Sequence, residues 1–195
     1  MKTQHRASEF TLSRADVERI ANATTSARDR TLVELLFYGG LRVAEACSLD
    51  VRDAELDRSR LRIVGKGEKL RVVTIPPALV WSLRSLIGRR VSGPVFVSRQ
   101  RRGDGHAQPI TTRTAERILA AAAERAGVAS PHPQRATVNP HLLRHSSARH
   151  MLGRGVDPRI VQHFLGHESV RTTLDVYGTP SEDEVAGDVL RAWDS

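Results

Sequence analysis

The sequence lacks several features that would assign it to common protein classes. Cys47 is its only cysteine, so an intramolecular disulfide is impossible, and its apolar surroundings favour a buried, inert thiol. Aromatic residues make up 4% of the chain, which argues against nucleic-acid binding by base stacking on aromatic platforms. No apolar run approaches the length of a membrane span, and the N-terminal segment MKTQHRASEF has no signal-peptide core. These absences favour a cytoplasmic protein that has no membrane partner.

Positive charge is the strongest compositional signal. The 195 residues carry a formal net charge of +8, and arginine supplies most of the cations. Residues 180–195 carry −4, so residues 1–179 carry +12. Guanidinium groups present a planar set of donors that matches phosphate oxygens. A basic body with a small acidic tail favours a DNA-binding surface, although charge alone is also compatible with a solvated surface without a partner.

Hydrophobic periodicity predicts an α+β domain that is mostly helical and carries one small antiparallel sheet. Apolar residues flank the segment GKGEK (65–69), which predicts a β-hairpin with lysines at its tip. A brief strand is expected over 95–97, and a loop over 98–110. Helices are expected from Ser13, over 27–38, 41–48, 79–87, 111–126, 139–152, 157–166 and 182–193, with a short one between Ser169 and Tyr177.

Five segments contain the residue types that phosphodiester chemistry requires. They are YGGLRVAEACSL (38–49), GKGEK (65–69), NPHLLRH (139–145), LGHES (165–169) and TTLDVYG (172–178). In order, type and approximate spacing they resemble the catalytic motifs of tyrosine recombinases, the family of phage integrases and Xer-type resolvases. Each motif alone is a weak signal, whereas five in register are a strong one. The resemblance extends from about Ser13 to Tyr177.

The resemblance implies a role for each matching residue. The catalytic residues that it implies are Arg42, Lys66, His141, Arg144, His167 and Tyr177. Tyr177 is then the nucleophile, and Glu45 matches an acid that braces Arg42. Spacing alone leaves Lys66 and Lys69 open as the general acid, and family position favours Lys66. The basic residues expected to contact DNA are Lys69, Arg71, Arg101, Arg102 and Arg113.

The same residues suit the chemistry on physical grounds. Direct displacement at a phosphodiester needs a nucleophile, cations on the non-bridging oxygens, and a proton for the leaving oxygen. A tyrosine phenol, with a pKa of ~10, must lose its proton during attack. Two arginines can bind both oxygens, and a hairpin lysine can protonate the leaving 5′ oxygen, so no cofactor is expected. His141 and Arg144, three residues apart at a helix N-terminus, are expected to share one face.

Each residue alone also has a plainer interpretation. Arg42 could be a surface arginine paired only with Glu45, and Tyr177 a half-buried packing residue. A metal site is the rival for the histidines, because His141/His145 and His163/His167 are spaced i, i+4. Gly166 is expected to end the second helix before His167, and neither a cysteine pair nor an H-E-x-x-H pattern is present, so no metal is expected. The histidines assigned to solvated or locally bonded positions are His5, His106, His132, His145 and His150.

The chain divides into an N-terminal extension (1–12), a catalytic domain (13–179) and a C-terminal helix (180–195). The apolar stripe of that helix either docks on a neighbouring subunit, as the resemblance implies, or packs on its own domain. Only 41 residues precede Arg42, whereas the resemblance implies an additional N-terminal helical domain that closes a clamp around DNA. An excised domain and a natural minimal protein are both compatible with this length.

The leading functional hypothesis is a site-specific DNA recombinase that works through a 3′-phosphotyrosyl intermediate. The resemblance implies double-stranded DNA as partner and a tetramer on DNA, with a monomer possible without DNA. Two alternatives stay open: a type IB topoisomerase-like relaxase, and a DNA-binding relic. The relic is disfavoured because none of the six reactive residues is missing.

Overall fold

The computed structural model describes residues 10–65, 70–99, 107–132, 137–166 and 182–194. Within these ranges the fold is mostly helical with one small antiparallel sheet, as the sequence predicted. The helices are α1 (Arg14–Asn22), α2 (Ala27–Tyr38), α3 (Val43–Ser48), α4 (Pro77–Ile87), α5 (Thr112–Arg125), α6 (Pro140–Gly153), α7 (Pro158–Leu165) and α9 (Glu182–Trp193). The strands, in sheet order, are β1 (Ala54–Glu55), β2 (Arg60–Val64) and β3 (Leu70–Thr74). None of the helices in these ranges is both long and apolar enough to cross a membrane.

Local signals in the sequence place the helix starts. At α1, the Ser13 hydroxyl accepts from the backbone N–H of Asp16, and the Asp16 carboxylate accepts from the backbone N–H of Ser13. At α6 the Asn139 side chain caps the helix and Pro140 occupies its first turn. Asp157 caps α7 in the same way. These predicted starts are confirmed.

The predicted hairpin forms, and the sheet extends it by one strand. β2 pairs with β3 in the register Leu61↔Val73 and Val64↔Leu70. The two-residue strand β1, which is too short to show alternation, pairs with β2 and was not predicted. The strand expected over 95–97 is not formed, because Val97 makes only an isolated bridge to Pro109.

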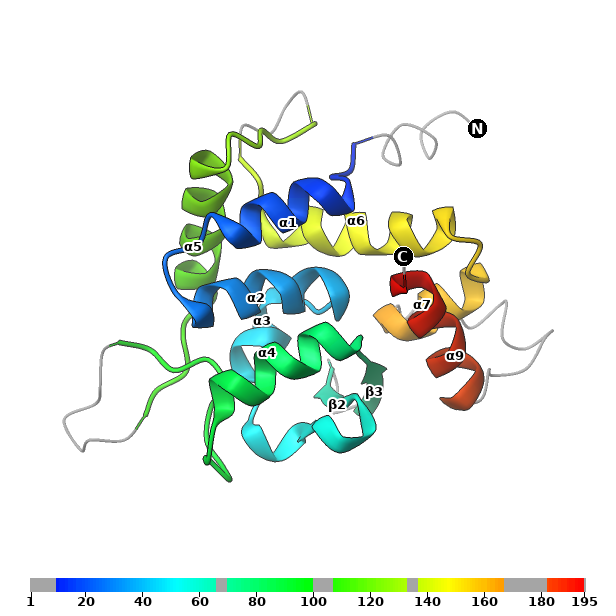
Figure 1. The fold of residues 1–195 in the computed structure, drawn as a ribbon, viewed down its shortest axis with the longest axis horizontal. Coiled ribbons are helices and arrows are strands. Elements are labelled where there is room, and N and C mark those ends of the chain that lie inside the picture. Colours follow the sequence, from blue (N-terminus) through cyan, green and yellow to red (C-terminus); the bar gives the residue numbers. More distant parts are fainter. Residues whose placement is uncertain (1–9, 66–69, 100–106, 133–136, 167–181, 195) are drawn as a thin grey trace.

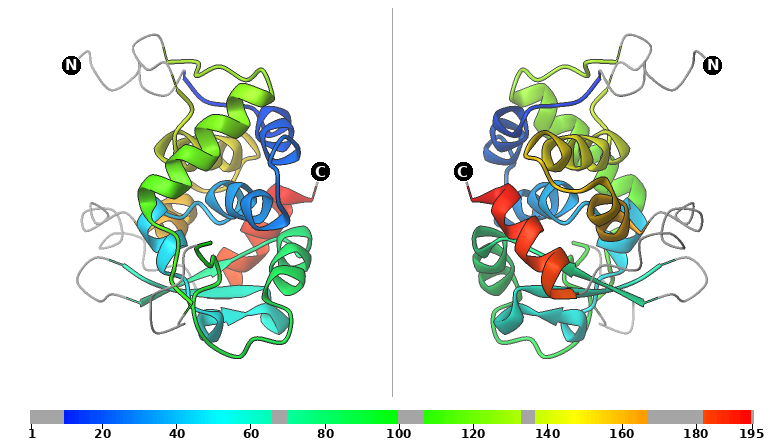
Figure 2. Two further views of the ribbon diagram at one scale, coloured as in Figure 1. Left: turned by 90° about the vertical axis from the view of Figure 1, so that its left-hand side faces the viewer. Right: turned by 90° about the vertical axis from the view of Figure 1, so that its right-hand side faces the viewer.

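Helix α2 lies at the centre of the core. Five of its apolar side chains are 0–1% exposed: Leu32, Val33, Leu35, Leu36 and Phe37. It packs against α1, α4 and α6. Figures 1 and 2 show the helices stacked above the sheet, which lies at the lower end of the molecule, with α9 along one edge beside β3 and α7.

The C-terminal helix α9 packs on its own domain in this structure. Trp193 is buried, and its ring stacks on that of His150 at 4.7 Å between centroids and 3° between planes. The Trp193 ring also meets Phe37 edge-on at 5.3 Å. Val185 and Val189 are buried in the same interface, whereas Leu190 is half-buried. The apolar stripe that suited a neighbouring subunit is therefore covered within the single chain.

Candidate active site

Arg42 and Glu45 lie at the start of α3, directly after the turn that ends α2. Arg42 is the N-cap residue, and Glu45 occupies the third helical position. The Glu45 carboxylate accepts from the backbone N–H of Arg42 at 2.8 Å and from Nη1 of Arg42 at 3.0 Å. The Glu45 side chain is only 6% exposed, whereas that of Arg42 is 44% exposed. The carboxylate is thus fixed in the core while the guanidinium that it braces stays open to a ligand.

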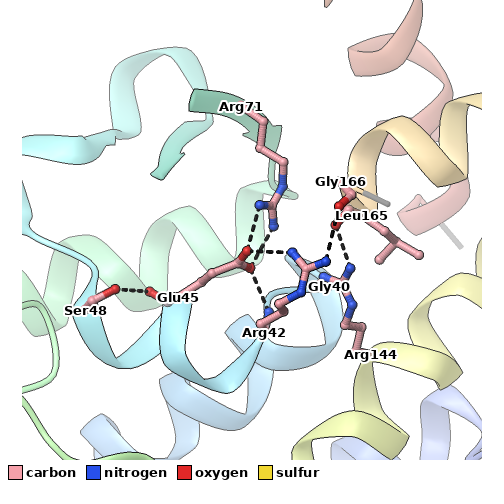
Figure 3. A network of polar contacts seen from close by, with 8 residues as sticks. All are labelled: Gly40, Arg42, Glu45, Ser48, Arg71, Arg144, Leu165 and Gly166. Carbon is pink, nitrogen blue, oxygen red and sulfur yellow. Dashed lines mark hydrogen bonds and ion pairs between the residues drawn. The ribbon is translucent and has the colours of Figure 1, made fainter. Parts of the chain in front are cut away.

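A second arginine reaches the same carboxylate from the sheet. Arg71 on β3 donates from Nη1 to Oε1 of Glu45 and from Nη2 to Oε2, both at 2.8 Å, and its side chain is 11% exposed (Figure 3). Burial alone would raise the pKa of Glu45, but the hydrogen bonds and charges of Arg71 and Arg42 lower it to about 2. The sequence grouped Arg71 with the DNA-contacting residues; the structure directs its terminal donors to Glu45 instead.

Arg144 approaches from α6 and is buried. It donates from Nη1 to the Gly40 carbonyl at 2.5 Å and from Nη2 to the Leu165 carbonyl at 2.6 Å. Burial lowers its pKa to about 10, with further lowering by Arg42 and Arg71. The side chain therefore remains a cation at neutral pH.

The guanidinium groups of Arg42 and Arg144 converge on the C-terminal end of α7. Arg42 donates from Nη2 to the Gly166 carbonyl at 3.2 Å, one residue beyond the Leu165 carbonyl that takes Arg144 (Figure 3). The last carbonyls of a helix carry partial negative charge and are not used inside the helix, so they suit cationic donors. Two cations are thus held side by side at the point where the chain enters the segment that carries His167 and Tyr177.

Two glycines allow this close approach. Gly40 has φ +56°, and a Cβ there would lie 2.8 Å from Cδ2 of Leu165. Gly166 has φ +67°, and a Cβ there would lie 2.9 Å from Cδ of Arg71. Only glycine combines a left-handed backbone with the absence of a side chain. Gly166 ends α7, as predicted from the sequence.

His141 lies in the first turn of α6 but has surroundings different from those of Arg144. It is exposed and lines a cavity of about 160 Å³ together with Phe10, His132 and His145. Arg144 instead points inward to Gly40 and Leu165, so the two side chains differ in burial. Residues three apart on a helix are offset by about 60°, so one of them can lie on the buried side of a shared face and the other at its exposed edge.

The remaining predicted residues divide between the surface and the undescribed segments. Arg113, in the first turn of α5, is exposed and remains a candidate for DNA contact. Across the described ranges, no group of three or more His, Cys, Asp or Glu side chains is arranged to hold a metal ion. The predicted residues that lie outside the described ranges are Lys66, Lys69, Arg101, Arg102, His167 and Tyr177.

The pairing of Arg71 with Glu45 was not predicted, although the sequence contained a signal for it. Arg71 lies opposite Ile63 in the hairpin, and Ile63 is buried. Arg71 is also spaced by two and four residues from Val73 and Ile75, which are both buried. Because side chains alternate between the faces of a strand, this spacing places Arg71 on the inner face of the sheet.

Comparison with known proteins identifies the family. The profile of the phage integrase family matches residues 11–184. The chain belongs to this family. Tyrosine recombinase XerA of Pyrococcus furiosus is 39% identical over 149 residues, which are 75% of this chain and 48% of that protein. The resemblance inferred from the motifs is therefore confirmed.

Solved structures of the family have the same fold. A crystal structure of XerA recombinase matches with a TM-score of 0.68 and 30% identity, over 91% of this chain and 62% of that one. The XerH recombinase bound to its difH substrate matches with a TM-score of 0.64 and 23% identity, over 91% of this chain and 53% of that one. The chain spans about half the length of the curated relatives that it matches.

Proposed function

We propose that this chain is the catalytic domain of a site-specific DNA recombinase that breaks and rejoins DNA through a 3′-phosphotyrosyl link at Tyr177. The observation that carries the proposal is the pair of guanidinium groups, Arg42 and Arg144, held side by side at the end of α7. Membership of the phage integrase family and similarity to tyrosine recombinases support the same reaction.

The proposed chemistry follows from the charges of the site. The phenol oxygen of Tyr177 attacks the phosphorus, the bond to the 5′ oxygen breaks, and Lys66 supplies the proton that this leaving oxygen takes up. Arg42 and Arg144 neutralise the charge that develops on the non-bridging oxygens, and they do so from fixed positions. The proton that the phenol loses passes to His141 or His167, and the other histidine hydrogen-bonds to the phosphate. Attack by a 5′ hydroxyl on the phosphotyrosine reverses the step and joins a strand.

The proposed partner is double-stranded DNA, and the proposed assembly is a tetramer on DNA that forms from monomers. The basic charge of residues 1–179 and the DNA-bound XerH neighbour support the partner. The assembly includes docking of α9 on a neighbouring subunit, which requires that α9 leave the site on its own domain. If a chain ending at Gly178 keeps its self-association and DNA affinity, that docking does not occur.

A nicked suicide substrate tests the reaction. A nick near the scissile phosphate lets the short strand diffuse away after cleavage, so that the covalent protein–DNA adduct accumulates. We expect an adduct with the wild-type protein and none with Tyr177→Phe. An adduct that persists in Tyr177→Phe would assign the nucleophile to another residue. Absence of an adduct with wild type, at protein concentrations that saturate the DNA, would favour a DNA-binding protein without this activity.

A further inference from the structure

We propose that Arg71 is a positioning residue that acts on the catalytic arginine Arg42 through Glu45, and that it makes no contact with DNA. This inference rests on the proposed function, because it assigns Arg42 to the scissile phosphate. It changes the role of a basic hairpin residue from ligand binding to internal support.

The hydrogen bonds of Glu45 show how the support is built. Its Oε1 accepts from Nη1 of Arg42 and from Nη1 of Arg71, and its Oε2 accepts from the backbone N–H of Arg42 and from Nη2 of Arg71. Both terminal nitrogens of Arg71 are thereby directed at one carboxylate. Its Nε is buried and has no hydrogen-bond partner within the described part of the chain. The Arg71 side chain is 11% exposed, and both of its terminal nitrogens are already paired with a carboxylate.

The charge balance explains why Arg42 needs a second arginine behind it. A buried carboxylate paired with Arg42 alone would neutralise the cation that the phosphate requires. Arg71 forms a bidentate pair with Glu45, which is the geometry in which guanidinium and carboxylate bind most strongly. Glu45 can then orient Arg42 while its own charge is balanced by Arg71. Three guanidinium groups and one carboxylate leave the described site with a net charge of +2.

Arg71 also supports the backbone acceptor of Arg42. Its side chain packs directly over the α carbon of Gly166, whose carbonyl takes Nη2 of Arg42. One side chain on β3 therefore contacts both features that fix Arg42, the carboxylate on α3 and the turn after α7. Figure 3 shows Arg71 reaching down from the strand to Glu45, with Arg42 between it and the end of α7.

Single-turnover cleavage of the suicide substrate separates support from DNA contact. For Arg71→Ala we expect the cleavage rate constant at saturating DNA to fall about 10- to 100-fold, with little change in Kd or in its salt dependence. Arg62→Ala is the matched control, because Arg62 lies on the neighbouring strand β2 and is exposed. It removes the same charge from the same sheet and should leave the saturated rate unchanged. An Arg71→Ala protein with a raised Kd, a smaller salt slope and the wild-type rate would overturn the proposal.

Two further measurements show whether Arg71 acts through Glu45. In a Glu45→Gln background, Arg71→Ala should cause little additional loss of rate, whereas multiplied losses would mean that the two residues act independently. Arg71→Lys, which keeps the charge but not the paired donors, should recover only part of the rate; full recovery would contradict the bidentate role. This variant also decides the matter if Arg71→Ala does not fold.

NMR titration of the Glu45 carboxyl gives a readout that does not depend on activity. The charged groups that face this carboxyl are Arg42, Arg71 and, at longer range, Arg144. Its pKa should rise when Arg71 is replaced by Ala and stay unchanged in Arg62→Ala. If the pKa of Glu45 is unchanged in Arg71→Ala, Arg71 does not support the Glu45 carboxylate. If the wild-type protein cleaves DNA and Arg71→Ala cleaves at the same rate, the role of Arg71 is refuted while the proposed function stands. If the wild-type protein does not cleave DNA, the proposed function is refuted, and the titration still tests whether Arg71 acts on Glu45.

Discussion

The guanidinium of Arg144 donates to the main-chain carbonyl of Gly40, across 104 residues of sequence. This bond ties α6 to the turn between α2 and α3, one residue before Leu41 and two before Arg42. The two phosphate-binding arginines of the proposed mechanism are therefore linked through the backbone as well as through the end of α7. The geometry of this turn is expected to control both stability and cleavage.

Replacing Gly40 by Ala should destabilise the protein through two effects. The left-handed backbone costs about 1–2 kcal/mol for an L-residue, and overpacking against Leu165 and Phe164 adds about 1–3 kcal/mol. Urea unfolding measures the sum. Gly127→Ala is the control, since Gly127 also has positive φ but would place its Cβ in open space. Equal losses for the two variants would show that the close approach at Gly40 is unimportant.

Glu45 should make a pH-dependent contribution to folding. Its pKa is lowered from 4.5 to about 2 in the folded protein, so the contribution is fully present above pH 4.5 and is lost as the pH falls toward 2. At neutral pH the contribution is about 3 kcal/mol at most. Urea unfolding of wild type and Glu45→Gln should therefore show a stability difference that is constant above about pH 5 and shrinks below it. A difference that does not shrink in acid would argue against the ion pairs.

Cys47 is expected to be unreactive in the folded protein. It is 5% exposed, and burial raises the pKa of its thiol to about 11. The thiolate is the reactive form, so a disulfide reagent such as dithiobis(nitrobenzoic acid) should find no accessible thiol at pH 8. In denaturant it should find one per chain, because Cys47 is the only cysteine. Rapid reaction of the native protein would contradict the burial.

Trp193 should contribute strongly to the stability of the free chain. It is 4% exposed and packs against His150, Phe37 and Tyr38, so its truncation to Ala should cost about 3–5 kcal/mol. Trp81→Ala is the matched control, because Trp81 is 76% exposed and should cost less than about 0.5 kcal/mol. Urea unfolding of the two variants should therefore differ clearly. Similar stabilities would mean that α9 does not cover its own domain in solution.

Residues whose structure depends on local sequence were predicted well. The caps of α1, α6 and α7, the hairpin and the end of α7 at Gly166 follow from side chains within a few positions. The apolar stripe of α9 was also predicted, but its partner surface was not. The sequence of residues 180–195 does not indicate whether the stripe packs on its own chain or on a neighbouring subunit, because either partner surface would be apolar.

In the described part of the site, the motifs indicated three of the residues that come together but not the contacts between them. The motifs indicated Arg42, Arg144 and Glu45, and the structure brings all three together with Arg71. The acceptors of the arginines are carbonyls of Gly40, Leu165 and Gly166, and a carbonyl carries no sequence signal. His141 and Arg144 lie about 60° apart around α6, and spacing alone does not determine which of the two is buried by the neighbouring elements.

Main-chain acceptors at the site have a consequence for how the protein tolerates substitution. A side-chain carboxylate can be deleted by one mutation, whereas the carbonyl of Leu165 persists whatever residue supplies it. A scan of α7 should therefore tolerate chemical change at Leu165 as long as the size and apolar character of the side chain keep the helix end in place. Substitutions that displace the backbone should impair cleavage even where they leave every charged residue intact. In the anchoring of Arg144, whose terminal nitrogens both donate to main-chain carbonyls, the site thus depends on the path of the chain more than on the identity of the residues along it.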